Sequence, residues 1–341
     1  MELYREMGQM RLKRRDFLTL LGGATMLGTT SALAQPANKD ARIGFLMGLA
    51  DDPESRTRTK AFETALQEEG WVVGRNVQID YRYGAGNAER IAAFAKELVN
   101  LKPDVLVGHS TPVVRELVKN TTKIPIVFVV VADPIGSGFA ASFPRPGGNS
   151  TGFTNLDSGI TGKMLTILRQ LVPNLRTAAL MYSPDSGPLG GLFYSRPFAE
   201  AAPTFGVKPI ILEVRTPAEV EKAMAQFEGQ SDAGLIVAPD NFMTVNRDLI
   251  VSLAARFRIP AIYPYRYFAE AGGLLSYGVD ITDLFRRAPG YVARIIRGTN
   301  PGDLPIQAPT KFELVVNLKT AKTLNITVPK ILLAGSDALI E

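Results

Sequence analysis

Two hydroxyl side chains stand where the sequence could bind a small anion. Ser110 and Thr111 follow the apolar residues 104–108 and come directly before Pro112, which favours the first turn of a helix. Hydroxyl groups beside the free N–H groups of a helix N-terminus suit a carboxylate or another small anion. Thr111 could equally serve only as the cap of its own helix. The residues therefore predict an anion subsite, with helix capping as the alternative.

Carboxylate and amide side chains follow two further apolar runs. Asp133 comes after residues 124–131, and Asp240 and Asn241 come after residues 233–238. Each carboxylate could accept hydrogen bonds from an ammonium group, or it could cap a helix or form a turn. Ligands of open parallel sheets bind beyond the carboxyl ends of the strands, so these loops are expected to face one cleft. Finding both carboxylates in that cleft would favour the ligand-binding interpretation.

Aromatic side chains cluster after a later apolar run. They could form an apolar wall of a binding site, or they could belong to the hydrophobic core. These residues are Tyr263, Tyr265, Tyr267 and Phe268.

Catalytic patterns are scarce in this chain. His109 is the only histidine and there is no cysteine, which excludes a metal cluster built on these ligands. A Ser–His–Asp triad would have to combine His109 with its neighbour Ser110, and no G-x-S-x-G motif or glycine-rich phosphate loop is present. We therefore expect no catalytic residues, no enzyme activity, no metal and no cofactor. An extracytoplasmic hydrolase is the less favoured alternative.

The loops need a scaffold, and the apolar patterning from residue 41 onward predicts alternating strands and helices. A first series has strands at 42–47, 76–82, 104–108 and 124–131 and helices at 57–69, 88–101 and 111–120. A second series has strands at 177–182, 207–213, 233–238 and 260–263 and helices at 159–171, 193–205, 217–227 and 245–257. Strands separated by such helices indicate parallel sheets covered on both faces, and therefore an α/β fold with two lobes.

Residues 1–34 have the features of a twin-arginine signal peptide. Arg14 and Arg15 precede an apolar stretch that is diluted by glycine and ends in an A-x-A site at residues 32–34. This stretch is shorter than the ~20 strongly apolar residues of a membrane span. Cleavage is expected near Ala34-Gln35. Lys13 stands where the usual motif has Ser or Thr, which leaves the ordinary Sec route open.

The mature chain is expected to be a periplasmic protein that is not lipidated and not inserted in the membrane, because it has no cysteine for a lipid anchor. The formal charge of +5 includes a positive contribution from the signal segment, and the mature chain has no long basic run. Nucleic-acid binding is therefore disfavoured, since a surface that follows phosphates needs clustered positive charge.

Several longer strings resemble the ABC-transporter substrate-binding proteins of the TrpX-like group. They are RIGFL at 42–46, FVVVADP at 128–134, RPGGNSTG at 145–152, AARFRIPAIY at 254–263, EAGGLLSYG at 270–278 and PTKFELVVNLKTAK at 309–322. The resemblance spans residue 42 to about residue 336 and so covers nearly the whole mature chain.

This resemblance implies a type I periplasmic binding protein fold, in which two Rossmann-like lobes with parallel sheets are joined by a hinge of three crossings. The crossings would lie near residues 150–155, 277–281 and 307–311, with Thr151, Gly278 and Thr310 as hinge residues. The first lobe would contain residues 40–153 and 281–308, and the second would contain residues 156–277 and 311–338. A helix expected at 283–297 would then return to the first lobe.

The resemblance also implies delivery of a small molecule, an aromatic or other amino acid, to an ABC permease with its ATPase by hinge closure. The expected ligand-binding residues are Ser110, Thr111, Asp133, Asp240, Asn241, Tyr263 and Tyr277. Asp240 is the candidate for the amino group, and a monomer is expected. The alternative is a periplasmic ligand-binding partner of a sensor or chemoreceptor. His109 and the loop at Gly190 and Gly191 depart from the family pattern and bear on the ligand class.

Overall fold

The first of two sheets in a computed structural model is entirely parallel. The model describes residues 40–155 and 159–341, so the predicted signal peptide lies outside the described residues. The sheet has the order β2-β1-β3-β4-β5. Its strands are β1 (Ala41–Met47), β2 (Val77–Tyr83), β3 (Val105–His109), β4 (Ile126–Val131) and β5 (Ser150–Thr154).

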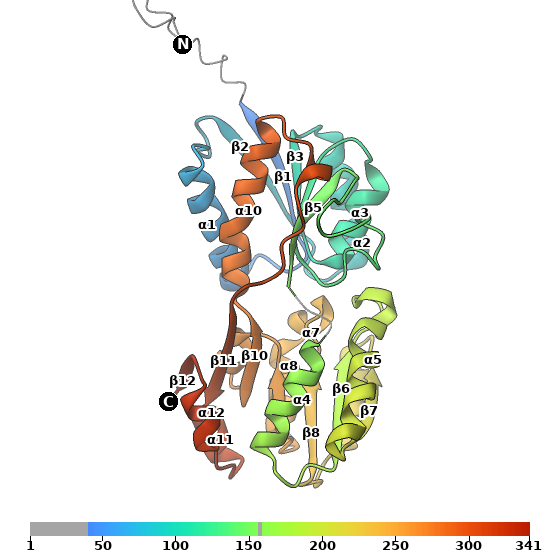
Figure 1. The fold of residues 1–341 in the computed structure, drawn as a ribbon, viewed down its shortest axis with the longest axis vertical. Helices are drawn as coiled ribbons and strands as arrows, with labels where there is room; N and C mark the ends of the chain where they lie inside the picture. The colour runs from blue at the N-terminus through green and yellow to red at the C-terminus, as the bar shows by residue number, and fades with distance from the viewer. Residues whose placement is uncertain (1–39, 156–158) are drawn as a thin grey trace, which may run out of the picture. The chain divides into compact units, whose positions relative to one another are not determined.

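Helices cover both faces of this sheet, as the apolar strands predict. They are α1 (Pro53–Glu68), α2 (Ala88–Asn100), α3 (Thr111–Asn120) and α10 (Ile281–Ile296). Helices α1 and α10 lie side by side on one face, and α2 and α3 lie on the other (Figure 1). Successive residues of β1 serve both layers, because Phe45 packs on Phe62 and Phe285 whereas Leu46 joins the cluster of α2 and α3. The late helix α10 thus belongs structurally with the first sheet.

The second sheet has seven strands in the order β12-β11-β10-β9-β8-β6-β7. They are β6 (Thr177–Tyr182), β7 (Lys208–Glu213), β8 (Ala233–Val237), β9 (Ala261–Tyr263), β10 (Leu275–Val279), β11 (Phe312–Asn317) and β12 (Ala338–Ile340). Every pair is parallel except β10 with β11. That pair is antiparallel because the chain leaves the second sheet at the end of β10 and returns to it at the start of β11.

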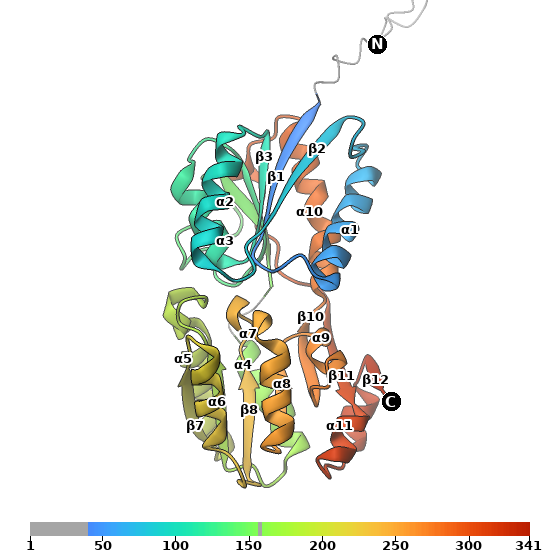
Figure 2. The ribbon, with the colours of Figure 1, turned by 180° about the vertical axis from the view of Figure 1, so that it is seen from behind.

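The second sheet is also covered on both faces. Its helices are α4 (Ile160–Leu171), α5 (Leu192–Ala201), α6 (Pro217–Ala225), α7 (Asn241–Val245), α8 (Arg247–Arg256), α9 (Arg266–Glu270), α11 (Leu318–Thr323) and α12 (Lys330–Ala334). Short 3-10 turns complete the chain at η1 (Pro188–Gly191), η2 (Ala202–Phe205) and η3 (Pro301–Asp303). Figure 2 shows α6 and α8 together on the face opposite α4. The predicted α/β fold class is confirmed.

The predicted hinge residue Thr151 lies in a strand of the first sheet. Thr151 lies inside β5, paired with Val127 of β4, and its hydroxyl donates a hydrogen bond to the carbonyl of Leu304 at 2.6 Å. The glycine-rich composition around it concealed a strand that belongs to the first sheet, and the chain leaves that sheet after Asn155. Thr151 thus lies in the last strand of the first sheet, and its hinge role stays a prediction.

The other two predicted hinge residues occupy different kinds of position. Gly278 lies in β10, where an added Cβ would stand 1.8 Å from the carbonyl oxygen of Pro264, so only glycine fits there. Thr310 is exposed in the segment that precedes β11. Their hinge role stays a prediction.

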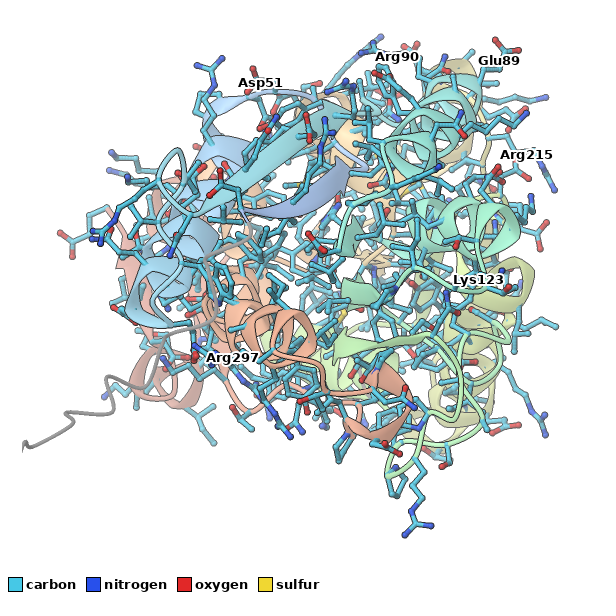
Figure 3. The ribbon with its side chains drawn as sticks, turned by 90° about the horizontal axis from the view of Figure 1, so that it is seen from above. Asp51, Glu89, Arg90, Lys123, Arg215 and Arg297 are labelled. Atoms are coloured by element: carbon cyan, nitrogen blue, oxygen red, sulfur yellow. The ribbon has the colours of Figure 1, made fainter. Side chains whose placement is uncertain are left out.

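Charged side chains of both signs project from the surface. Figure 3 labels Asp51, Glu89, Arg90, Lys123, Arg215 and Arg297 around the outside of the ribbon. Some form exposed ion pairs, such as Arg297 with Glu69 at 3.5 Å, which contribute only about 0–1 kcal/mol each. In the part of the chain that the structure describes, no helix is long and apolar enough to cross a membrane.

Candidate ligand-binding site

A pocket lies where the carboxyl ends of strands from the two sheets meet. Its walls come from α1 and the loops after β1, β3 and β4 on one side, and from the loops after β6, β8 and β9 on the other. The cavity volume is about 30 Å³, below the ~300–1,000 Å³ range of small-molecule sites, so the two walls lie close together in this structure. The structure therefore places a cavity at the position that the strand-end rule predicts.

The loop after β3 contributes an unpaired hydroxyl and a strained backbone. Ser110 precedes α3 with φ 83° and ψ 155°, and its side chain caps no N–H group of that helix. Its Oγ is buried without a hydrogen-bond partner. Val130 in the same wall also has a positive φ, 63°, beside a register shift between β4 and β5. Such strained residues occur preferentially at functional sites, where the surrounding structure holds them in place.

Thr111 and His109 flank Ser110 and also line the pocket. Thr111 is buried at the first position of α3. The buried Nδ1 atom of His109 accepts a hydrogen bond from the Gly48 N–H at 3.4 Å. Burial and the nearby positive charge of Arg58 hold the pKa of His109 well below its usual value. The imidazole is therefore neutral, and its remaining ring N–H is on Nε2.

Gly48 keeps the two walls close together. A Cβ on this residue would lie 2.6 Å from the Ser110 hydroxyl and 3.2 Å from the side-chain oxygen of Asn241. A side chain at position 48 would therefore fill the space in which these polar atoms meet.

Arg58 is a pocket residue that the sequence reasoning missed. It projects from α1, is only 1 % exposed, and donates to Glu54 at 3.3 Å from one guanidinium nitrogen. Its Cζ lies 5.2 Å from the centre of the Tyr267 ring, and its Nε is buried without a partner. One signal could have revealed it, because Arg58 lies four residues before Phe62 on the apolar stripe of α1.

Asp240 lines the pocket but uses its carboxylate to hold its own loop. It accepts hydrogen bonds from the Ser183 N–H at 2.8 Å, the Ser186 hydroxyl at 2.9 Å and the Met243 N–H at 2.8 Å. Burial raises the pKa of Asp240 to about 6, although these donors act in the opposite direction. The helix-capping alternative thus describes what the carboxylate does in this structure.

Two asparagines present free carbonyl oxygens to the pocket. Asn241 donates from Nδ2 to the Gly48 carbonyl at 3.4 Å, and Asn155 donates from Nδ2 to the Tyr265 hydroxyl at 2.7 Å. Both Oδ1 atoms are buried without partners. An ammonium group is a matching donor for such oxygens. Asn155, which the sequence reasoning also missed, lies 110 residues from its partner, so its position could not be derived locally.

The structure does not bring every predicted residue to this pocket. Ser110, Thr111, Asp240 and Asn241 line it, whereas Asp133, Tyr263 and Tyr277 do not. Asp133 closes a turn by accepting from the Gly136 N–H at 2.8 Å. Tyr263 stacks on Phe268 in the core, and Tyr277 stacks on Phe312 between neighbouring strands. The aromatic part of the wall comes instead from Tyr265 and Tyr267, together with Tyr194.

The described residues include no group of three or more histidine, aspartate or glutamate side chains arranged to hold a metal ion.

Comparison with known proteins identifies the family. A family model described as "ABC transporter substrate binding protein" matches residues 46–340. The chain belongs to this family. The resemblance predicted from the sequence is thereby confirmed, and the members of this family bind solutes outside the cytoplasm for ABC transporters.

Individual relatives agree with this assignment. A tyrosine-binding protein of Clostridioides difficile (strain R20291) is 25% identical over 289 residues, which is 85% of this chain and 82% of the relative. A crystal structure from Streptococcus pneumoniae in complex with L-Trp has a TM-score of 0.81 at 26% identity, covering 88% of this chain and 100% of that chain. A conserved domain protein from Vibrio cholerae has a TM-score of 0.82 at 26% identity and the same coverage. These neighbours have the type I periplasmic binding protein fold.

Proposed function

We propose that this chain binds an amino acid between its two lobes and delivers it to an ABC importer. The observation that carries the proposal is a set of buried polar atoms without partners that face one pocket. They are Ser110 Oγ, Asn155 Oδ1, Asn241 Oδ1 and Arg58 Nε. Leaving such a group unpaired costs about 1–3 kcal/mol, so a polar ligand that pairs several of them is strongly favoured.

The pocket has complementary groups for both ends of a zwitterion. The Ser110 hydroxyl and the N-terminus of α3 suit the α-carboxylate, because this helix end carries positive partial charge. The carbonyl oxygens of Asn155 and Asn241 suit the α-ammonium group. The relative named for tyrosine and the neighbour crystallised with L-Trp support an aromatic amino acid as the preferred ligand.

Hinge closure is the proposed mechanism. Gly48 comes directly after β1 of the first sheet, and Asn241 lies in the loop after β8 of the second sheet. The hydrogen bond between them joins residues 193 positions apart in the chain. A ligand that touches both walls stabilises this closed arrangement through its differential affinity for it. The closed form then docks, as a monomer, on a permease with its ATPase.

Export precedes this function in the proposal. The mature protein would begin at Gln35 in the periplasm, without a lipid anchor, after removal of residues 1–34. N-terminal sequencing of the protein recovered from periplasmic extract tests this. A sequence that begins at Gln35 supports it, and an intact N-terminus contradicts it.

A thermal-shift screen of the mature protein against L-amino acids, sugars, purines and small carboxylates tests the binding function. A ligand at hundredfold excess over its Kd raises the free energy of unfolding by about 2.7 kcal/mol. We expect a shift with aromatic L-amino acids and none with sugars or purines, and no turnover of a model ester. The D-enantiomer of each responding amino acid is the matched control. A shift with sugars alone would contradict the proposal.

A further inference from the structure

Arg58 contributes a positive charge to the pocket. The proposed contacts of Ser110, Asn155 and Asn241 with the α-carboxylate and α-ammonium groups of an amino acid do not use this charge. The Arg58 guanidinium is almost completely buried and forms an ion pair with Glu54 at 3.3 Å through Nη2. Glu54 itself is 29% exposed, so solvent weakens its attraction. A buried guanidinium with an unpaired Nε is costly, and an oxygen atom of a ligand would satisfy it.

The aromatic side chains beside Arg58 contact its guanidinium but leave its Nε without a partner. The Tyr267 ring presents its face to the guanidinium at 5.2 Å. The Tyr267 hydroxyl pairs with the Thr244 hydroxyl at 3.2 Å and also interacts with Arg58. Burial raises the pKa of Tyr267, and Arg58 acts to lower it. Tyr265 is likewise engaged, because its hydroxyl accepts from Asn155. Arg58 therefore lines the pocket with a guanidinium whose Nε has no partner.

His109 lies in the same wall as Arg58. Its Nδ1 accepts from the Gly48 N–H, so the N–H of the neutral ring is on Nε2. Among the described residues of this wall, the unpaired donor in addition to the carboxylate subsite is Arg58 Nε, which indicates a ligand with an acceptor beyond the α-carboxylate.

We propose that Arg58 determines specificity and that the ligand is an L-amino acid whose side chain carries an oxygen acceptor, such as a phenol hydroxyl or a carboxylate. This inference rests on the proposed function. The Nε–H of Arg58 donates to the side-chain oxygen, whereas a hydrocarbon side chain of similar size leaves that nitrogen unpaired. A site built for such a bond discriminates against the analogue that lacks it.

Calorimetric titration with two matched ligand pairs tests this. L-tyrosine is compared with L-phenylalanine, and L-glutamate with L-norvaline, so that each pair differs in the side-chain oxygens. In the wild type we expect the oxygen-bearing member of one pair to bind at least about tenfold more tightly than its partner. The pair that shows the preference distinguishes a phenol ligand from a carboxylate ligand.

Arg58→Met should then reduce this preference to less than about threefold, mainly by weakening the oxygen-bearing member. Arg56→Met is the matched control, because Arg56 lies on the same helix but is exposed and paired with Asp51. Its preference should equal that of the wild type. Arg58→Lys keeps the charge but lacks the planar fork of donors, so it should also lower the preference. It replaces Arg58→Met as the test variant where Arg58→Met does not fold.

Three results would overturn the inference. Equal binding of both members of each pair by the wild type shows that no side-chain oxygen is recognised. An equal loss for both members in Arg58→Met shows that Arg58 binds the shared α-carboxylate, and the proposed function then still stands. Failure of every amino acid to bind the wild type removes the proposed function together with this inference.

Discussion

Ser110 and Asp240 occupy equivalent places in the two lobes but differ in what their side chains do. Each is the N-cap residue of a helix that follows a buried parallel strand, and each lines the same pocket. Asp240 has an extended backbone with φ −111°, and its carboxylate accepts from three donors of its own lobe. Ser110 has φ 83°, caps no N–H group, and keeps an unpaired buried hydroxyl.

The difference shows how one local signal can serve structure or binding. The Asp240 carboxylate is fully engaged by donors of its own lobe, so this wall of the pocket is held in place by contacts within the protein. At Ser110 the hydroxyl caps no N–H group of its helix and has no other partner, so it is available to a ligand. Asp240 should therefore matter mainly for stability and Ser110 mainly for affinity.

The largest expected effect comes from Asp240→Ala. This change leaves the donors of Ser183, Ser186 and Met243 without their buried acceptor, and it should lower the free energy of unfolding by about 2–4 kcal/mol. Urea denaturation measures the loss. Asp185→Ala, at an exposed site in the neighbouring loop, is the control and should change stability by less than about 0.5 kcal/mol. If Asp240→Ala lowered the free energy of unfolding by as little as Asp185→Ala, the proposed difference between the structural role of Asp240 and the binding role of Ser110 would be contradicted.

Ser110→Ala should show the opposite balance. Removing a buried hydroxyl that has no partner in the protein should raise the free energy of unfolding by about 1 kcal/mol, yet weaken ligand binding about tenfold or more. Calorimetric titration with the best amino acid from the screen measures affinity, and denaturation measures stability. Unchanged affinity would place the carboxylate subsite elsewhere in the pocket.

The pH dependence of stability should report on Asp240. Its pKa is raised to about 6 in the folded protein, so the folded state binds more protons than the unfolded state between about pH 4 and 6. Stability contributed by protonation is present below the unfolded pKa and is lost as pH rises through about 6. Between pH 7 and pH 5 the wild type should gain about 1 kcal/mol relative to Asp240→Asn.

His109 acts in the opposite direction, because its lowered pKa favours protonation of the unfolded state as pH falls. Both proteins contain His109, so its contribution cancels when the wild type is compared with Asp240→Asn. A difference between the two proteins that does not change with pH would show that Asp240 stays ionised in the fold.

The smallest effect is expected for Ser110→Gly. Glycine adopts φ 83° without the steric cost that serine bears, so this variant should be about 1 kcal/mol more stable than Ser110→Ala. Both variants lack the hydroxyl and should bind the ligand equally weakly. Equal stability of the two variants would mean that Ser110 is not strained.

Much of the scaffold could be predicted because its signal is local. The long apolar runs of β1 and β4 predict buried strands, and the Thr-Pro pair at the start of α3 predicts the beginning of a helix. Shorter elements gave no such signal. The strand β5, rich in small and polar residues, and the five-residue helix α7 were missed because neither shows a full hydrophobic period.

The sequence by itself determined the family, the α/β architecture and the loops that carry Ser110 and Asp240. Only the tertiary structure decided which polar atoms in those loops stay unpaired. Pairing depends on residues far apart in the chain, as Asn241 with Gly48 and Asn155 with Tyr265 show. Arg58 likewise lines the pocket because of contacts between residues far apart in the chain. Helix α1 packs beside α10, and Arg58 on α1 lies over the ring of Tyr267 in the other lobe. A local pattern can propose a cap, but distant packing decides whether that cap serves the helix or a ligand.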